Sequence, residues 1–426
     1  MPAMAGMPHE ISAPPEAPPT PKPADSMAGM DMGRMDMSRD AAAGAGMMAG
    51  ALGAYSMMRD ASGTSWQPQS TPMQGISFAS GGWTGMIHGF ADLAYDHQGG
   101  PRGGSKTFSE SMLMLMAQHR AGPGTFTFRT MVSLDPAMGA QGYPLLLQSG
   151  ETANGVDPLV DRQHPHDLFM ELSGTYSLPV ARETSAFLYA GYPGEPALGP
   201  VTFMHRVSGM DDPAAPISHH WLDSTHITYG VVTAGVARGA WKLEGSVFNG
   251  REPDEHRWGF DPFRLNSWSA RISWNPTPDW ALQTSYGYIK SPEALEPGVD
   301  QHRITASATY NRPLVGGDWQ TTLAWGRNYN SPGRTLDAVL LESAVILGRH
   351  TVFARVEDVQ KDELFAGQVF RVAEASLGYV YDLPLAKHVA LGLGAMGTAN
   401  LVPDSLKPAY GSNPVGWMPF VRIKLK

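Results

Sequence analysis

The sequence contains no cysteine in its 426 residues. This absence excludes a disulfide framework, thiolate metal sites and the acylated cysteine of a lipoprotein anchor. Charged residues make up only 17% of the chain, and the net charge of −9 argues against nucleic acid as a partner. No run reaches the roughly 18 consecutive apolar residues that a membrane-spanning helix needs. Apolar residues are instead spread through shorter patterns along the chain.

Those patterns begin at Trp83, where runs of about ten residues alternate between polar and apolar side chains and are separated by turn residues. Such alternation is typical of strands whose two faces meet different surroundings. Sixteen runs can be distinguished. They are 83–96, 110–120, 124–134, 167–177, 184–191, 226–238, 240–249, 267–275, 280–290, 302–311, 318–328, 337–347, 350–358, 368–381, 387–397 and 416–425.

Connection lengths provide a second, independent indication of the fold. After even-numbered runs the connections are short, as at Gly239 and Gly348–Arg349, and after odd-numbered runs they are longer, as at 135–166 and 192–225. Bacterial outer-membrane barrels alternate in this way, with short periplasmic turns and long external loops. A soluble β-sandwich has no reason to do so. The sequence therefore predicts an all-β fold, a transmembrane antiparallel β-barrel of about 16 strands.

This fold class sets expectations for location and partners. We expect the barrel to lie in the outer membrane of a Gram-negative cell, with membrane lipid as its main partner. Even strand parity places both chain ends in the periplasm. The chain begins Met1-Pro-Ala-Met without a basic segment followed by an apolar core. We therefore expect the export leader to have been removed or to lie upstream.

Residues 1–75 differ in composition from the barrel region, 76–426. They are rich in proline, alanine, glycine and methionine and poor in aromatics, so they are expected to be a disordered periplasmic tail. Twelve of the 24 methionines lie before residue 60. The densest group has MxM and MxxM spacings and consists of Met27, Met30, Met32, Met35 and Met37.

Thioether sulfur is a soft, neutral ligand that suits Cu(I) or Ag(I) and barely binds harder ions. Close spacings let two or three sulfurs of a flexible chain reach one ion, so the tail is a candidate soft-metal site. The alternative is low-complexity drift, since methionine is also an adaptable hydrophobic residue.

A second group of methionines falls on the polar faces of the first three runs. These residues share their faces with Glu110, Gln118 and Arg129, while leucine and phenylalanine occupy the opposite faces. We expect the polar faces to line the lumen, where a methionine ladder beside a histidine could relay Cu(I). Alternatively, the methionines pack against an inserted loop or the tail. The residues concerned are Met86, His88, Met112, Met114, Met116 and Met131.

Histidines and acids cluster in the long loops. Six of the fourteen histidines lie within Asp161–His226, with HxH and HHx₅H spacings that can supply a Cu(II) or Zn(II) site. The accompanying arginines and carboxylates equally suit a salt-bridged network that folds the loops into the barrel mouth. The candidate ligands are His164, His166, His219, His220 and His226.

The tail resembles that of the B-type copper-resistance outer-membrane proteins, and the matching residues are Ser26–Met37. Members of that family usually mix histidine into these repeats, whereas this tail has only His9. The barrel region is similar to uncharacterised outer-membrane proteins of heavy-metal resistance. The similar stretches are Ser62–Pro68, Asp96–Gly103, Asp161–Leu172 and Gly250–Asp254. The resemblance implies copper as the bound ion and periplasmic copper-handling proteins as partners.

Taken together, these features predict an outer-membrane barrel of copper or silver tolerance, whose tail and lumen bind or pass soft metal ions. Two alternatives remain: a general or substrate-specific diffusion porin, and a plugged structural barrel. The sequence has no nucleophile–base pair, paired-carboxylate signature or phosphate loop, so we do not expect an enzyme.

Overall fold

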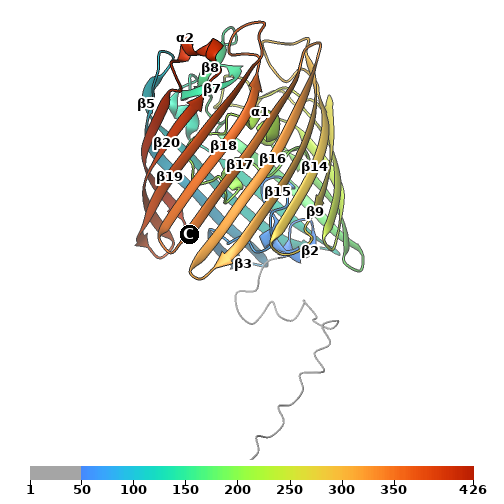
Figure 1. The fold of residues 1–426 in the computed structure, drawn as a ribbon. Helices are drawn as coiled ribbons and strands as arrows, with labels where there is room; N and C mark the ends of the chain where they lie inside the picture. Colours follow the sequence, from blue (N-terminus) through green and yellow to red (C-terminus); the bar gives the residue numbers. More distant parts are fainter. Residues whose placement is uncertain (1–48) are drawn as a thin grey trace, which may run out of the picture. The chain divides into compact units, whose positions relative to one another are not determined.

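The computed structural model describes residues 49–426, and these form a closed antiparallel barrel of sixteen long strands (Figure 1). Every predicted run corresponds to one strand of the barrel. The strands are β4 (Trp83–Gln98), β5 (Gly104–Ala121), β6 (Gly124–Val132), β9 (Phe169–Ala181), β10 (Thr184–Gly191), β11 (Val231–Arg238), β12 (Trp241–Phe248), β13 (Ser267–Trp274), β14 (Trp280–Ile289), β15 (Asp300–Leu314), β16 (Gly317–Ser331), β17 (Thr335–Leu347), β18 (His350–Lys361), β19 (Phe370–Ala386), β20 (Val389–Leu401) and β21 (Val415–Leu425).

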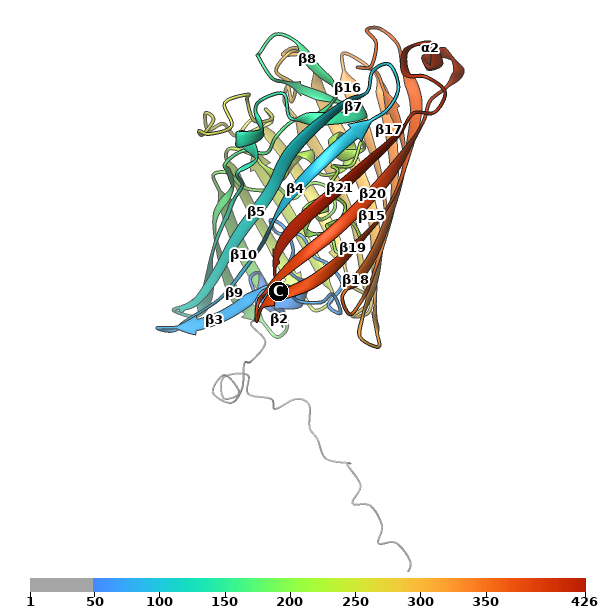
Figure 2. The same ribbon diagram turned by 90° about the vertical axis from the view of Figure 1, so that its left-hand side faces the viewer.

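The barrel closes where β21 pairs with β4, from Gly416 opposite Gln98 to Lys424 opposite Phe90 (Figure 2). A short extra strand, β3, pairs with the beginning of β4. None of the helices described in residues 49–426 has the length and apolar character needed to cross a membrane. The remaining elements are β1 (Ala49–Gly50), β2 (Gly53–Ser56), β3 (Ile76–Ser80), β7 (Tyr143–Thr152), β8 (Pro158–Gln163), α1 (His219–Leu222), α2 (Lys407–Tyr410) and short 3-10 helices at Met57–Arg59, Asp135–Met138, Phe203–His205, Ser224–His226 and Asp404–Leu406.

Side chains alternate across the wall as the period-two pattern predicts. On β21, Val421 and Ile423 are exposed on the outside, whereas Arg422 and Lys424 are buried inside. Trp241 and Trp274 stack outside the barrel with ring centroids 4.9 Å apart, close to the short-turn end. An apolar exterior with aromatic side chains near strand ends is what a membrane-spanning barrel requires.

The lumen is filled largely by the connection between β10 and β11, residues 192–230. All of these residues are buried except Tyr192, His205 and Met210, which are partly exposed. Apolar residues of the connection, including Ile217 and Trp221, join the main hydrophobic cluster with residues of the barrel wall. We call residues 192–230 the lumen loop.

Buried ion pairs hold the lumen loop to the wall. Arg206 contacts Glu342 of β17 through Nε at 2.6 Å and Asp223 of the loop itself through Nη1 at 2.7 Å. Gly209 lies so close to Glu342 that a Cβ atom would come within 2.6 Å of its carboxylate. Elsewhere Arg422 of β21 pairs with loop residue Asp211 at 2.8 Å. The loop is therefore fixed by charges that are only satisfied when it lies inside the barrel.

Residues 49–74 form a second insertion, across the short-turn end of the lumen. Basic side chains of the wall donate to its backbone: Arg129 to Ala61 O at 3.1 Å, and Lys242 to Thr64 O. Arg271 donates to Ser65 Oγ at 2.7 Å. We call residues 49–74 the N-terminal plug. For these residues the predicted disorder is wrong. Charged side chains of the barrel wall donate hydrogen bonds to their backbone carbonyl groups, and the composition of the segment does not reveal these partners.

Candidate metal centre in the barrel lumen

The predicted methionine ladder does face the lumen. Met112, Met114 and Met116 are 2–5% exposed, whereas Leu113 on the opposite face of β5 is 49% exposed. Register explains this arrangement, since Met114 lies opposite His88 of β4 and Met131 of β6. The inward orientation is thus confirmed, while metal binding by these residues stays a prediction.

A cavity of about 100 Å³ lies between this ladder, the N-terminal plug and the lumen loop. Thioether groups come to it from all three, and Asp60 and Arg129 also line it. Met112 does not line this cavity but a smaller one beside it. The methionines and histidines of the larger cavity, which we call the Met/His cavity, are Met57, Met58, Met73, Met86, Met114, Met116, Met210, His88 and His205.

Two imidazoles at the cavity contact thioether sulfurs. The Nε2 atom of His88 lies 3.1 Å from Met114 Sδ, and the Nε2 atom of His205 lies 3.3 Å from Met131 Sδ. The two rings are 5.6 Å apart. With the bond lengths of zinc sites, about 2.0 Å to nitrogen and 2.3 Å to sulfur, one ion in tetrahedral geometry needs a nitrogen–sulfur separation of roughly 3.5 Å. Small rotations of the flexible methionine side chains can supply that difference.

The charge state of the cavity also suits a soft cation. Burial, together with His88 and Arg129, lowers the pKa of His205 to about 3, so its ring is neutral at pH 7 and keeps a lone pair. Arg129 is the nearby cation, and Glu171 neutralises it at 2.9 Å. The methionine and histidine donors of the cavity are therefore neutral, which favours Cu(I) or Ag(I) over harder ions, and Asp60 is the one carboxylate among the lining residues.

The loop histidines form a separate buried cluster. The ring of His226 lies 5.3 Å from that of His166 and 5.1 Å from that of His219, and the rings of His219 and His220 are 5.7 Å apart. His164 joins the cluster through His220, at 6.1 Å. All five predicted loop histidines are thus brought together, although they come from two loops.

Hydrogen bonds orient these rings. The Nδ1 atoms of His166 and His219 each donate to a carboxylate at 2.8 Å, from Asp135 and Asp223 respectively. The Nδ1 atom of His226 donates to Asp223 O at 3.0 Å. Burial lowers the pKa of His219 to about 4 and that of His226 well below its usual value. These hydrogen bonds belong to the structural network that the sequence analysis gave as the alternative. Metal binding by His164, His166, His219 and His226 stays a prediction.

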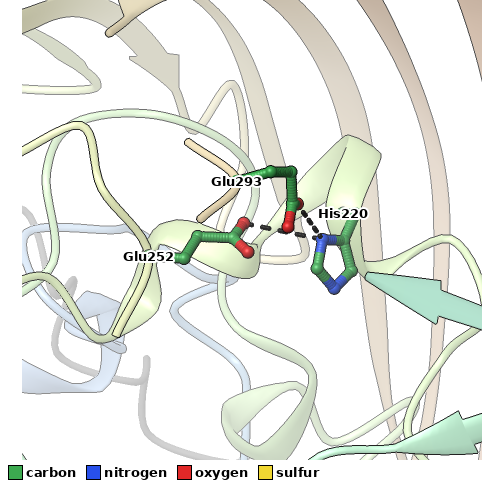
Figure 3. Close-up of side chains that lie close together, drawn as sticks. All are labelled: His220, Glu252 and Glu293. Carbon is green, nitrogen blue, oxygen red and sulfur yellow. Dashed lines mark ion pairs between the residues drawn. The ribbon is translucent and has the colours of Figure 1, made fainter. Parts of the chain in front are cut away.

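His220 at the edge of the cluster faces two acids from neighbouring long loops (Figure 3). Its Nδ1 atom lies 3.5 Å from Glu252 Oε1 and 3.6 Å from Glu293 Oε1. Burial alone would lower the pKa of His220, but Glu252 and Glu293 outweigh it and raise that pKa. His220 therefore faces two carboxylates at once, whereas His164, His166 and His219 each contact one.

The structure assembles some predicted residues and adds others. Met27, Met30, Met32, Met35 and Met37 lie outside the described residues. Sequence reasoning did not single out Met73 and Met210 for the cavity, because each is an isolated methionine with no spacing signal. Glu293 was missed because it too stands alone in the sequence, without a spacing signal. His205 was part of the histidine pattern of the loops but was not chosen as a ligand.

Comparisons with known proteins identify the fold. No protein-family model matches the chain, and no curated protein matches it. Among solved structures, OmpF of Salmonella typhi in complex with daunomycin superposes with a TM-score of 0.50 at 8% identity, over 82% of this chain and 100% of that one. An anion-selective porin from Comamonas acidovorans gives 0.48 at 12% identity, over 80% and 99%. OmpT of Vibrio cholerae gives 0.45 at 7%, over 82% and 99%. The chain shares the porin barrel fold.

Proposed function

We propose that this protein is an outer-membrane barrel of copper or silver tolerance that binds soft metal ions in its lumen and passes them outward. The observation that carries the proposal is the Met/His cavity, where seven thioethers and two imidazoles surround one small space. In a porin lumen the usual lining is polar and charged, so a concentration of soft donors needs its own explanation.

The surroundings of the cavity fit this role. The cavity lies toward the short-turn end, which we assign to the periplasm, and the N-terminal plug forms part of its wall. The chain that precedes the plug carries the MxM and MxxM repeats. We propose that the tail collects Cu(I) or Ag(I) in the periplasm and delivers it to the cavity, without catalysing a reaction.

The cavity is tested by replacing Met86, Met114 and Met116 with leucine and measuring the affinity of the purified barrel for Ag(I). These swaps keep volume and polarity, so folding should persist. Loss of a residue that hydrogen-bonds to a metal ligand already lowers metal affinity roughly 10–100-fold. Loss of three sulfur ligands should lower the Ag(I) affinity at least as much.

Met396 and Met418 provide the matched control. They are buried inside the barrel on the paired strands β20 and β21, away from any histidine contact with sulfur. Their double replacement by leucine should leave Ag(I) affinity unchanged. Equal affinity in all three proteins would remove the basis of the proposal. Removing residues 1–48 should lower the number of Ag(I) ions bound but keep the tight site.

A diffusion porin is the second candidate, and the fold similarity to OmpF favours it. It predicts an open path for small solutes that is indifferent to the methionines. Four cavities along the lumen have volumes of only about 10 to 100 Å³. Planar-bilayer conductance separates the two candidates: a large, steady conductance of the intact protein would favour the porin.

A further inference from the structure

The long-loop end of the lumen contains a second, chemically different cavity. It has a volume of about 40 Å³ and lies between α1 and the loops that follow β12, β14 and β18. This volume is enough for an ion with a water molecule. Its acidic side chains are Glu252, Glu293, Glu296, Asp362 and Glu363.

Acidic side chains outnumber basic ones among the residues that line this cavity. Arg303 is the only cation among the lining residues, and its hydrogen bonds go to Gln301, Asn328 and Ser224. No carboxylate of residues 49–426 lies within ion-pair distance of Arg303 or of nearby Lys361. Glu252 is buried, and a buried carboxylate is costly unless a cation joins it.

Three ligand atoms already converge in this cavity. His220, Glu252 and Glu293 each offer one atom, and the three lie within 4.8 Å of one another (Figure 3). Glu252 is 8% exposed, and its Oε2 atom has no hydrogen-bond partner among the described residues. The carboxylate of Glu293 is oriented by a hydrogen bond, because its Oε2 atom accepts the backbone N–H of Glu151 at 3.1 Å.

We propose that His220, Glu252 and Glu293 bind a borderline divalent transition-metal ion, Zn(II) or Cu(II), at the external end of the lumen. One imidazole with two carboxylates is a donor set for such ions and a poor one for Cu(I) or Ag(I). The unpartnered Glu252 oxygen gains the partner it lacks, and the ion offsets the excess of negative charge.

The site does not depend on the Met/His cavity, which lies at the other end of the lumen and has the opposite preference among metals.

The test is Zn(II) titration of the full-length barrel, first stripped with a chelator, and of the E252Q/E293Q variant. We expect one tight site in the unmodified protein and at least about a tenfold loss of affinity in the variant. The Ag(I) affinity of the variant should stay unchanged, so failure here is distinguishable from failure of the proposed function. Heat-modifiable migration on gels verifies that each variant is folded.

A second cluster provides the control. Asp254, Glu255 and His256 also lie close together, but His256 is 80% exposed and the group faces solvent. The D254N/E255Q/H256N variant should keep the tight Zn(II) site. If E252Q/E293Q misfolds, the H220N variant is used with Cu(II) electron paramagnetic resonance, and loss of one nitrogen coupling is expected. Unchanged Zn(II) affinity in E252Q/E293Q, or an unchanged Cu(II) spectrum in H220N, would overturn the proposal.

Discussion

Replacing Arg206 with alanine is expected to destabilise the barrel by about 3–5 kcal/mol and to increase its conductance. Arg206 is fully buried and joins Asp223 of the lumen loop to Glu342 of the wall. Its removal leaves Asp223 with His219 as its only remaining side-chain partner among the described residues and weakens the pairing of Glu342. The lumen loop then loses a main attachment to the wall. Thermal unfolding in detergent and planar-bilayer recording measure the two effects.

The matched control is Arg371→Ala. Arg371 pairs with Asp358 at 2.7 Å, but both side chains are exposed, and such pairs contribute about 0–1 kcal/mol. We therefore expect little change in the melting temperature or conductance of this variant. A melting temperature of Arg206→Ala equal to that of Arg371→Ala would contradict the role assigned to the buried pairs.

Deleting residues 1–74 is the second change with a large expected effect, because it removes the N-terminal plug. Arg129, Lys242 and Arg271 would then face water instead of plug carbonyl and hydroxyl groups. We expect the conductance to rise severalfold and the Ag(I) affinity to fall, since Met57, Met58 and Met73 leave the cavity.

The reference protein for this deletion is the chain that lacks only residues 1–48. The comparison assigns the effect to residues 49–74 rather than to the methionine repeats before them. If both truncated proteins conduct equally, the N-terminal plug does not obstruct the lumen. Any obstruction to ion flow would then come from the lumen loop.

The strands of this fold could be predicted from the sequence because the wall separates two environments. Lipid outside and polar lumen inside impose a strict alternation, as on β13, where Trp268 and Ile272 are exposed and Arg271 is buried. The same alternation placed Met112, Met114 and Met116 on the inner face. Register within a hairpin then determined that Met114 meets His88.

The contents of the lumen could not be predicted in the same way. The lumen loop has no period, and its burial depends on ion pairs between residues more than a hundred positions apart, such as Arg206 and Glu342. The N-terminal plug has the composition of a disordered segment. It is ordered because basic side chains from distant strands donate hydrogen bonds to its carbonyl groups, as Lys242 does to Thr64 O.

The candidate sites follow the same division. Histidine spacing indicated the loop cluster, and the structure brings all five predicted rings together. The acids that face His220 come from two other loops, and no spacing links Glu252 to Glu293. Sites built from several loops need the closed barrel before their members can be recognised.

The central claim is that the Met/His cavity holds a soft metal ion, and anomalous diffraction from crystals of the Ag(I)-loaded barrel tests it most directly. We expect one strong silver peak within bonding distance of His88 or His205 and of at least one sulfur of Met86, Met114, Met116 or Met131. Silver only at surface positions, with an empty cavity, would contradict the account.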